Sequence, residues 1–128
     1  MVVSDPMTVQ ITPEQMEKYR ASARAREATL KIEFEARRQR AWEVARQAAL
    51  ILKDEFGVSR VVVFGSLLHT ERFHWRSDID LAVWDIQHYF RAVARLMDLD
   101  PEIEFDLVPF EDARPGILAV IQEEGIDL

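Results

Sequence analysis

Cysteine is absent from the 128-residue sequence, and glycine is scarce, with four residues in the whole chain. Without cysteine the chain forms no disulfide, no thiolate zinc site and no cysteine nucleophile. No apolar run approaches the roughly 20 residues that a membrane-spanning helix needs. The first residues also lack the basic and apolar regions of a secretory signal. We therefore expect a cytoplasmic protein with one domain's worth of core.

Basic residues are fewer than acidic residues and are unevenly distributed along the chain. The net charge is −7, from 16 basic and 23 acidic residues. Residues 12–53 carry ten Lys and Arg against six Asp and Glu, whereas residues 54–128 carry six against sixteen. The acidic part argues against nonspecific nucleic-acid binding and fits a site for cations or a surface for a basic partner. The basic stretch Arg37–Arg40 is typical of a solvated helix face.

One long helix is predicted in the first half of the chain. Thr12 can cap it, Pro13 suits the first helical position, and no further Gly or Pro follows until Gly57. This pattern predicts a continuous helix over 13–55. Residues 42–56 form its better amphipathic part, with apolar residues at spacings of three and four, and are expected to cover the core.

Three parts of the chain follow from this pattern. Residues 1–11 are expected to form a flexible leader, and residues 12–41 a helical extension. The remaining residues, 42–128, are expected to form the compact domain.

Strands and helices alternate after the long helix. Residues 60–64 form a β-branched run that ends at Gly65, and residues 79–84 and 103–108 alternate apolar with polar side chains. Between the last two, Asp85 can cap a helix whose apolar face is Ile86, Phe90, Val93 and Met97. A last helix is predicted to open at Pro115 and to close at Gly125. The fold class is therefore α/β (α+β), with a small mixed three-stranded sheet flanked by helices and a long N-terminal helix.

Acidic side chains occur at unusual places on two predicted strands. Asp78 and Asp80 are two residues apart, so both are expected on the same face of one strand. Asp106 lies on the polar face of another strand. If the two strands are neighbours, three carboxylates converge, which is unfavourable without a cation. Carboxylate oxygens are hard ligands, so this predicts a site for Mg²⁺ or Mn²⁺.

A glycine–serine pair follows the buried strand directly. Gly65 allows close approach of the backbone to a bulky anion, and Ser66 adds a hydroxyl. A turn of this kind beside a metal-binding Asp-x-Asp strand indicates phosphoryl or nucleotidyl transfer. No Walker sequence is present.

These motifs, in this order, resemble a known family. Gly65-Ser66, then eleven residues, then Asp78–Leu81 and later Phe105–Val108 are similar to the DNA polymerase β-type nucleotidyltransferase superfamily. The pattern is most similar to its minimal bacterial branch, the MNT type. The resemblance covers roughly residues 42–128 and implies a nucleotidyltransferase-like domain.

The resemblance also implies a mechanism and a partner. It implies that Asp78 and Asp80 bind two Mg²⁺ ions, that Asp106 binds the ion activating the attacking hydroxyl, and that Gly65 and Ser66 hold the triphosphate of ATP. Minimal members are often antitoxins paired with a HEPN ribonuclease toxin, and some transfer AMP to a toxin tyrosine. The resemblance thus implies a protein adenylyltransferase that acts as an antitoxin in a hetero-oligomer.

The turn departs from the family pattern, in which Gly-Ser is usually followed by a small residue, Arg and Gly. Here Leu67 and Leu68 follow, and no second glycine is present. Arg72 or Arg76 is a candidate for the missing positive charge. Two alternatives therefore stay open, a non-catalytic module that neutralises its partner sterically and a nucleotidyltransferase for a small molecule such as an aminoglycoside.

Overall fold

A computed structural model of the chain describes residues 10–74 and 78–128. The chain divides into two compact units, Met1–Glu33 and Phe34–Leu128. Most of the predicted leader, and also Arg76, lie outside the described residues. The predicted domain limits at residues 12 and 42 stay a prediction.

The predicted long helix is confirmed as α1, Pro13–Phe56. A reciprocal pair of hydrogen bonds fixes its start, because the Gln15 backbone N–H donates to Thr12 Oγ1 at 3.1 Å and the Thr12 N–H donates to Gln15 Oε1 at 3.0 Å. This arrangement is a capping box, which satisfies two otherwise unpaired donors at the helix N-terminus.

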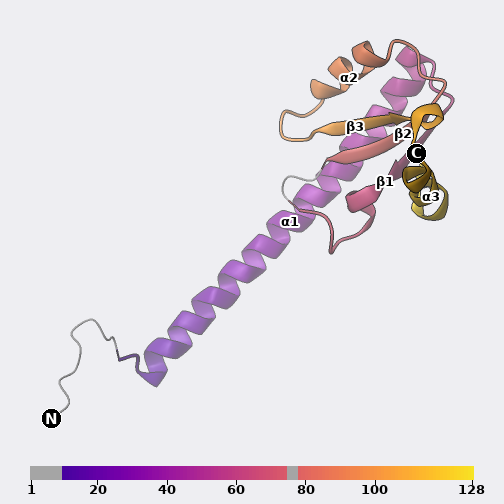
Figure 1. Cartoon of the computed structure of the whole chain (residues 1–128). Coiled ribbons are helices and arrows are strands. Elements are labelled where there is room, and N and C mark those ends of the chain that lie inside the picture. The colour runs from indigo at the N-terminus through magenta and orange to yellow at the C-terminus, as the bar shows by residue number, and fades with distance from the viewer. Residues whose placement is uncertain (1–9, 75–77) are drawn as a thin grey trace. The chain divides into compact units, whose positions relative to one another are not determined.

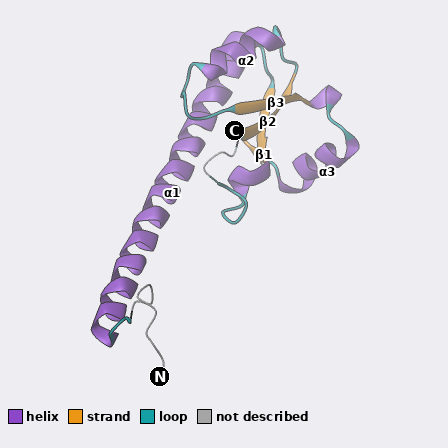
Figure 2. Cartoon of the chain, turned by 60° about the vertical axis from the view of Figure 1, so that its left-hand side comes forward, coloured by secondary structure: helices purple, strands orange, loops and turns teal. Residues whose placement is uncertain are grey.

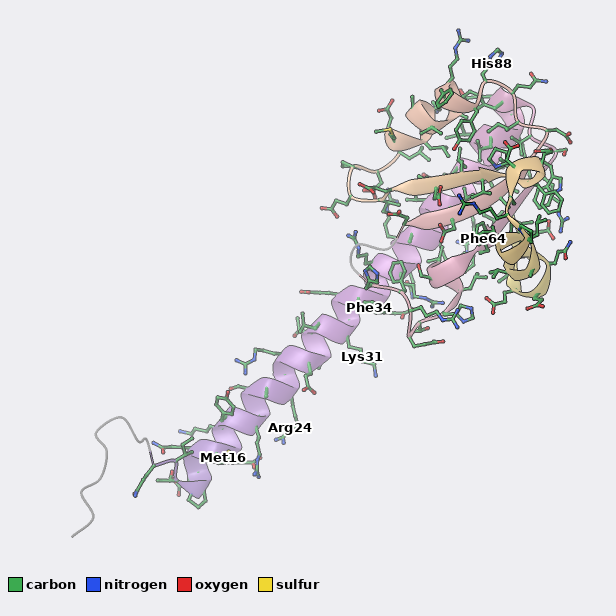
Figure 3. The ribbon with its side chains drawn as sticks, viewed as in Figure 1. Met16, Arg24, Lys31, Phe34, Phe64 and His88 are labelled. Atoms are coloured by element: carbon green, nitrogen blue, oxygen red, sulfur yellow. The ribbon has the colours of Figure 1, made fainter. Side chains whose placement is uncertain are left out.

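The first unit contains the beginning of α1. Figure 3 marks Met16, Arg24 and Lys31 along this stretch, and Arg24 forms an exposed ion pair with Glu17 at 3.1 Å. Large apolar side chains are exposed here as well, among them Leu30 and Ile32. None of the helices within residues 10–74 and 78–128 combines the length and the apolar composition of a membrane span.

The second unit is built on a four-stranded mixed sheet, and Figure 1 labels three of its strands. Its strands are β1 (Arg60–Phe64), β2 (Ile79–Trp84), β3 (Phe105–Pro109) and β4 (Ile126–Asp127), in the spatial order β3-β2-β1-β4. β2 and β3 are parallel, whereas β1 is antiparallel to both of its neighbours. The predicted mixed sheet is thus confirmed, with β4 as an additional strand that sequence analysis did not predict.

Each face of the sheet packs on helices (Figure 2). The larger core joins residues of α1 from Ala41 onward and of α2 (Tyr89–Met97) to Val61, Val63, Leu81 and other side chains of one sheet face. On the other face, Ile121 of α3 (Pro115–Glu124) packs with Val62, Phe64 and Ala82. The predicted start of α3 at Pro115 is confirmed, and Gly125 follows its last residue.

The prediction for α2 was wrong in two respects. Asp85 is not its cap, because the helix begins at Tyr89 and Asp85 has a left-handed φ of 62° and accepts a 2.6 Å hydrogen bond from Ser59. Its buried residues are Ala92 and Leu96, whereas Phe90 is 85% exposed. Of the rest of the predicted apolar face, Ile86 and Val93 are partly buried against the larger core, whereas Met97 is exposed like Phe90.

Candidate active site

Strand pairing brings two of the predicted acidic residues side by side. β2 and β3 pair in parallel with Asp80 opposite Asp106, and Phe64 of β1 lies opposite Asp80 on its other side. Figure 3 marks Phe64 at the end of β1. Neighbouring strands lie about 4.8 Å apart, and directly paired residues point to the same face. The two aspartates therefore share the sheet face that α3 covers in part.

Asp80 is the most strongly perturbed acid of this group. Burial, then the negative charge of Asp106, then that of Asp78 raise the pKa of the Asp80 carboxyl to about 6. Each cause penalises the ionised form, and within the described residues no hydrogen bond or ion pair to Asp80 compensates. An acid perturbed in this way is a candidate for function.

Gly65 packs directly against this carboxyl. Its φ is 81°, a left-handed value that residues with side chains rarely adopt. A Cβ added at this position would collide with Asp80 Oδ2. The glycine is therefore required both by the backbone conformation and by the close approach of the turn to Asp80.

The turn after β1 is a short 3₁₀ helix, Gly65–Leu68. Ser66 is half-buried at its start, and its carbonyl accepts the His69 N–H at 3.1 Å. His69 in turn contacts Glu124 of α3 through Nε2 at 2.9 Å, and the hydrogen bond from His69 lowers the pKa of Glu124. These contacts hold the end of the turn against α3.

The donor chemistry fits a divalent cation, although the side chains are not gathered around one point. Asp78, directly before β2, and Asp106 are exposed, and Asp80 is half-buried. No group of three or more His, Asp or Glu side chains in the described ranges is close enough to hold a metal ion. The oxygen ligands and the mutual repulsion at Asp80 nonetheless suit Mg²⁺. Asp78, Asp80 and Asp106 as metal ligands, and Gly65 and Ser66 as the phosphate-binding pair, stay predictions.

Sequence analysis misjudged one basic residue near the turn. Arg38 of α1 is half-buried, and its Nη2 donates to the Leu67 carbonyl at 3.1 Å. The expectation of a solvated helix face was therefore wrong for Arg38, and also for its half-buried neighbour Arg37, which donates to the Glu102 carbonyl. The available signal was its spacing, because Arg38 lies three and seven residues before the buried Ala41 and Ala45.

Comparison with known proteins identifies the family. The family model described as Polymerase beta, nucleotidyltransferase matches residues 46–128. The chain therefore belongs to the polymerase beta nucleotidyltransferase family.

A solved structure shares the fold. The chain is similar to a chain of a crystal structure described as the toxin-antitoxin MntA-HpeT in a mutant form, with a TM-score of 0.53 and 18% identity. The similarity covers 65% of this chain and 70% of that chain. No curated protein matches the sequence.

Proposed function

We propose that this protein is a Mg²⁺-dependent nucleotidyltransferase that moves AMP from ATP to a hydroxyl group. One observation carries the proposal. A half-buried Asp80 without a described cationic partner is paired with Asp106 on the adjacent strand and lies against the Gly65 turn. Family membership supports the reaction class.

In the proposed reaction, the acceptor oxygen attacks the α-phosphorus of ATP. A bond forms between these two atoms, the bond from the α-phosphorus to the bridging oxygen breaks, and pyrophosphate leaves. Asp106 accepts the proton of the attacking hydroxyl or orients it for release. Asp78 and Asp80 would hold two Mg²⁺ ions, together with Asp106. When bound, such ions neutralise charge on the phosphates and lower the pKa of a coordinated hydroxyl.

Gly65 and Ser66 are proposed to hold the triphosphate. The glycine lets the turn approach closely, and Ser66 offers a hydroxyl and backbone groups at the end of β1. Positioning of the α-phosphorus next to the acceptor is the main contribution that such a site makes. Residues 42–128 are the proposed catalytic domain.

The proposed acceptor is a tyrosine of a partner HEPN ribonuclease toxin, which makes this chain the antitoxin of a cytoplasmic hetero-oligomeric pair. The similar fold of a chain from the toxin-antitoxin MntA-HpeT supports this choice. A tyrosine hydroxyl is also a chemically suitable nucleophile once deprotonated.

The test is to incubate the full chain with its toxin partner, Mg²⁺ and ATP labelled at the α-phosphate. We expect label on a toxin tyrosine, with a mass increase equal to AMP, and loss of labelling in the Asp78→Asn and Asp80→Asn variants. Asp98→Asn, at an exposed site after α2, is the matched control and should label normally. Unchanged labelling in the Asp80 variant contradicts the proposal. Labelling of an aminoglycoside instead of the toxin would reassign the acceptor.

A second candidate is a non-catalytic antitoxin that neutralises its partner by binding alone. The observation in its favour is that Asp78, Asp80 and Asp106 do not gather into a ready metal site among the described residues. Under this alternative, an Asp78→Asn/Asp80→Asn double variant still neutralises the toxin, whereas a chain lacking residues 13–40 does not.

A further inference from the structure

Arg38 is a partly buried cation at the Gly65–Leu68 turn. Its Nη2 donates to the backbone carbonyl of Leu67 at 3.1 Å. Its Nε is buried and has no hydrogen-bond partner among the described residues. The guanidinium carries five N–H donors, so this environment leaves most of its capacity unused within the protein.

The neighbouring arginines of α1, unlike Arg38, have carboxylate partners. Arg37 contacts Glu102 at 3.5 Å, and Arg40 contacts both Asp100 at 3.3 Å and Glu43 at 3.5 Å. Arg38 forms no ion pair with a described residue. Of the three, Arg38 is thus the one whose positive charge is not neutralised by a carboxylate of the chain.

Retaining an unneutralised cation in a partly buried place is unfavourable for folding alone. The charge becomes favourable when an anion occupies the adjacent turn. Leu67 directly follows Ser66, so the guanidinium is bonded to the same short turn that is proposed to hold the triphosphate. The residues that directly follow Ser66 are Leu67 and Leu68, so the turn contains no Lys or Arg, and the positive charge at its backbone comes from α1.

We infer that Arg38 is a positioning residue for the nucleotide, fixing the Gly65–Leu68 turn through the Leu67 carbonyl and supplying positive charge for the triphosphate. The inference rests on the proposed nucleotidyltransferase function. It differs from the expectation that Arg72 or Arg76 supplies this charge, because the contact comes from α1. A charge role predicts that the benefit grows with the number of phosphates on the ligand.

The experiment measures the affinity of the full chain for ATP and for AMP in the presence of Mg²⁺, by calorimetry. Arg38→Gln keeps a polar side chain with N–H donors but removes the charge, and Arg38→Lys keeps the charge. We expect Arg38→Gln to weaken ATP binding about tenfold and AMP binding no more than about threefold, while Arg38→Lys stays within about threefold for ATP. Arg40→Gln, the matched control on the same helix, should stay within about twofold for both ligands.

Distinct results overturn the inference and the proposed function. If the wild-type chain binds neither nucleotide, both fail. If it binds ATP and Arg38→Gln leaves that affinity unchanged, or weakens the binding of ATP and of AMP equally, only the role of Arg38 fails.

If Arg38→Gln does not fold, as judged by its circular dichroism, Arg38→Lys becomes the deciding variant. A tenfold loss of ATP affinity in folded Arg38→Lys overturns the charge role. Added salt should weaken ATP binding more in the wild type than in Arg38→Gln.

Discussion

Charged side chains are paired with opposite charges at one end of the β1–β2 pair and with like charges at the other end. At the end where β1 begins, Arg60 bonds Asp127 through Nε at 2.6 Å and Nη2 at 3.1 Å, and its guanidinium lies 4.6 Å from the Trp84 ring centroid. At the end where β1 finishes, Asp80 and Asp106 are paired across adjacent strands without an ion pair to any described residue.

The two ends differ in whether the charges of the chain compensate one another. The first end matches cation with anion, and the hydrogen bond from Arg60 lowers the pKa of Asp127. The second end brings carboxylates together, and burial with two acidic neighbours raises the pKa of Asp80. Repulsion that a fold retains without compensation from its own cations is typical of a site for an external ligand. The following predictions test whether the two ends differ in this way.

The largest contrast is expected between two aspartates, one from each end. Asp106→Asn should lower AMP transfer by on the order of 10³-fold, because it removes a proposed ligand and proton acceptor. Asp127→Asn should leave the rate within about twofold, since it alters an exposed ion pair. Rates from single-turnover labelling check this, and equal losses in the two variants would abolish the distinction.

Gly65→Ala should have the next largest effect. The added Cβ collides with Asp80 Oδ2, and a φ of 81° is unfavourable for alanine. A displacement of the turn of this kind is expected to lower transfer by about 100-fold. Gly116→Ala is the matched control, because a Cβ there meets no atom within 4 Å. If the Gly65 variant retains full activity, the turn does not position the substrate.

Stability should respond to Asp80 in an unusual direction. Because its pKa is raised to about 6, the folded state binds a proton more tightly than the unfolded state, and stability falls as pH rises between about 4 and 6. In a metal-free buffer above pH 6, Asp80→Asn should therefore be more stable than the wild type by on the order of 1 kcal/mol, after allowance for solvent screening. Urea unfolding at pH 4 and pH 7.5 measures this gap. A variant that is less stable at pH 7.5 contradicts it, and added Mg²⁺ should stabilise only the wild type.

The smallest effect is expected for the stability of Asp127→Asn. The folded pKa of Asp127 is lowered, so its ion pair contributes stability above the unfolded pKa and loses it as pH falls through the folded value. Thermal unfolding should show a small loss at pH 7 that disappears in acid. A loss that grows toward low pH would show that the pairing with Arg60 is not its cause.

Much of the fold could be predicted because local patterns agree with the tertiary structure. The β-branched run of β1, the alternation in β2 and the single uninterrupted helix α1 each carry a clear periodic signal. β4 carries none, since a strand of only Ile126 and Asp127 exists through its pairing with Val62 and Val63. Its formation depends on contacts distant in sequence.

The candidate site could be predicted in part for the same reason. Spacing indicated that Asp80 and Asp106 lie on polar strand faces, but only the sheet order makes their strands neighbours. Arg38 and Leu67 are 29 positions apart in the sequence, so their contact depends on the tertiary structure and could not be predicted from a local pattern. For Asp85 the local pattern was misleading, because the pattern predicted a helix cap, whereas its carboxylate accepts a hydrogen bond from Ser59.

The parallel pairing of β2 with β3 makes the alignment of these two strands decisive for the acidic pair. A shift of one position between them would move Asp106 to the opposite side of the sheet, because side chains alternate. A deletion or insertion of one residue within β3 would therefore separate Asp106 from Asp80 even where the sheet itself still forms.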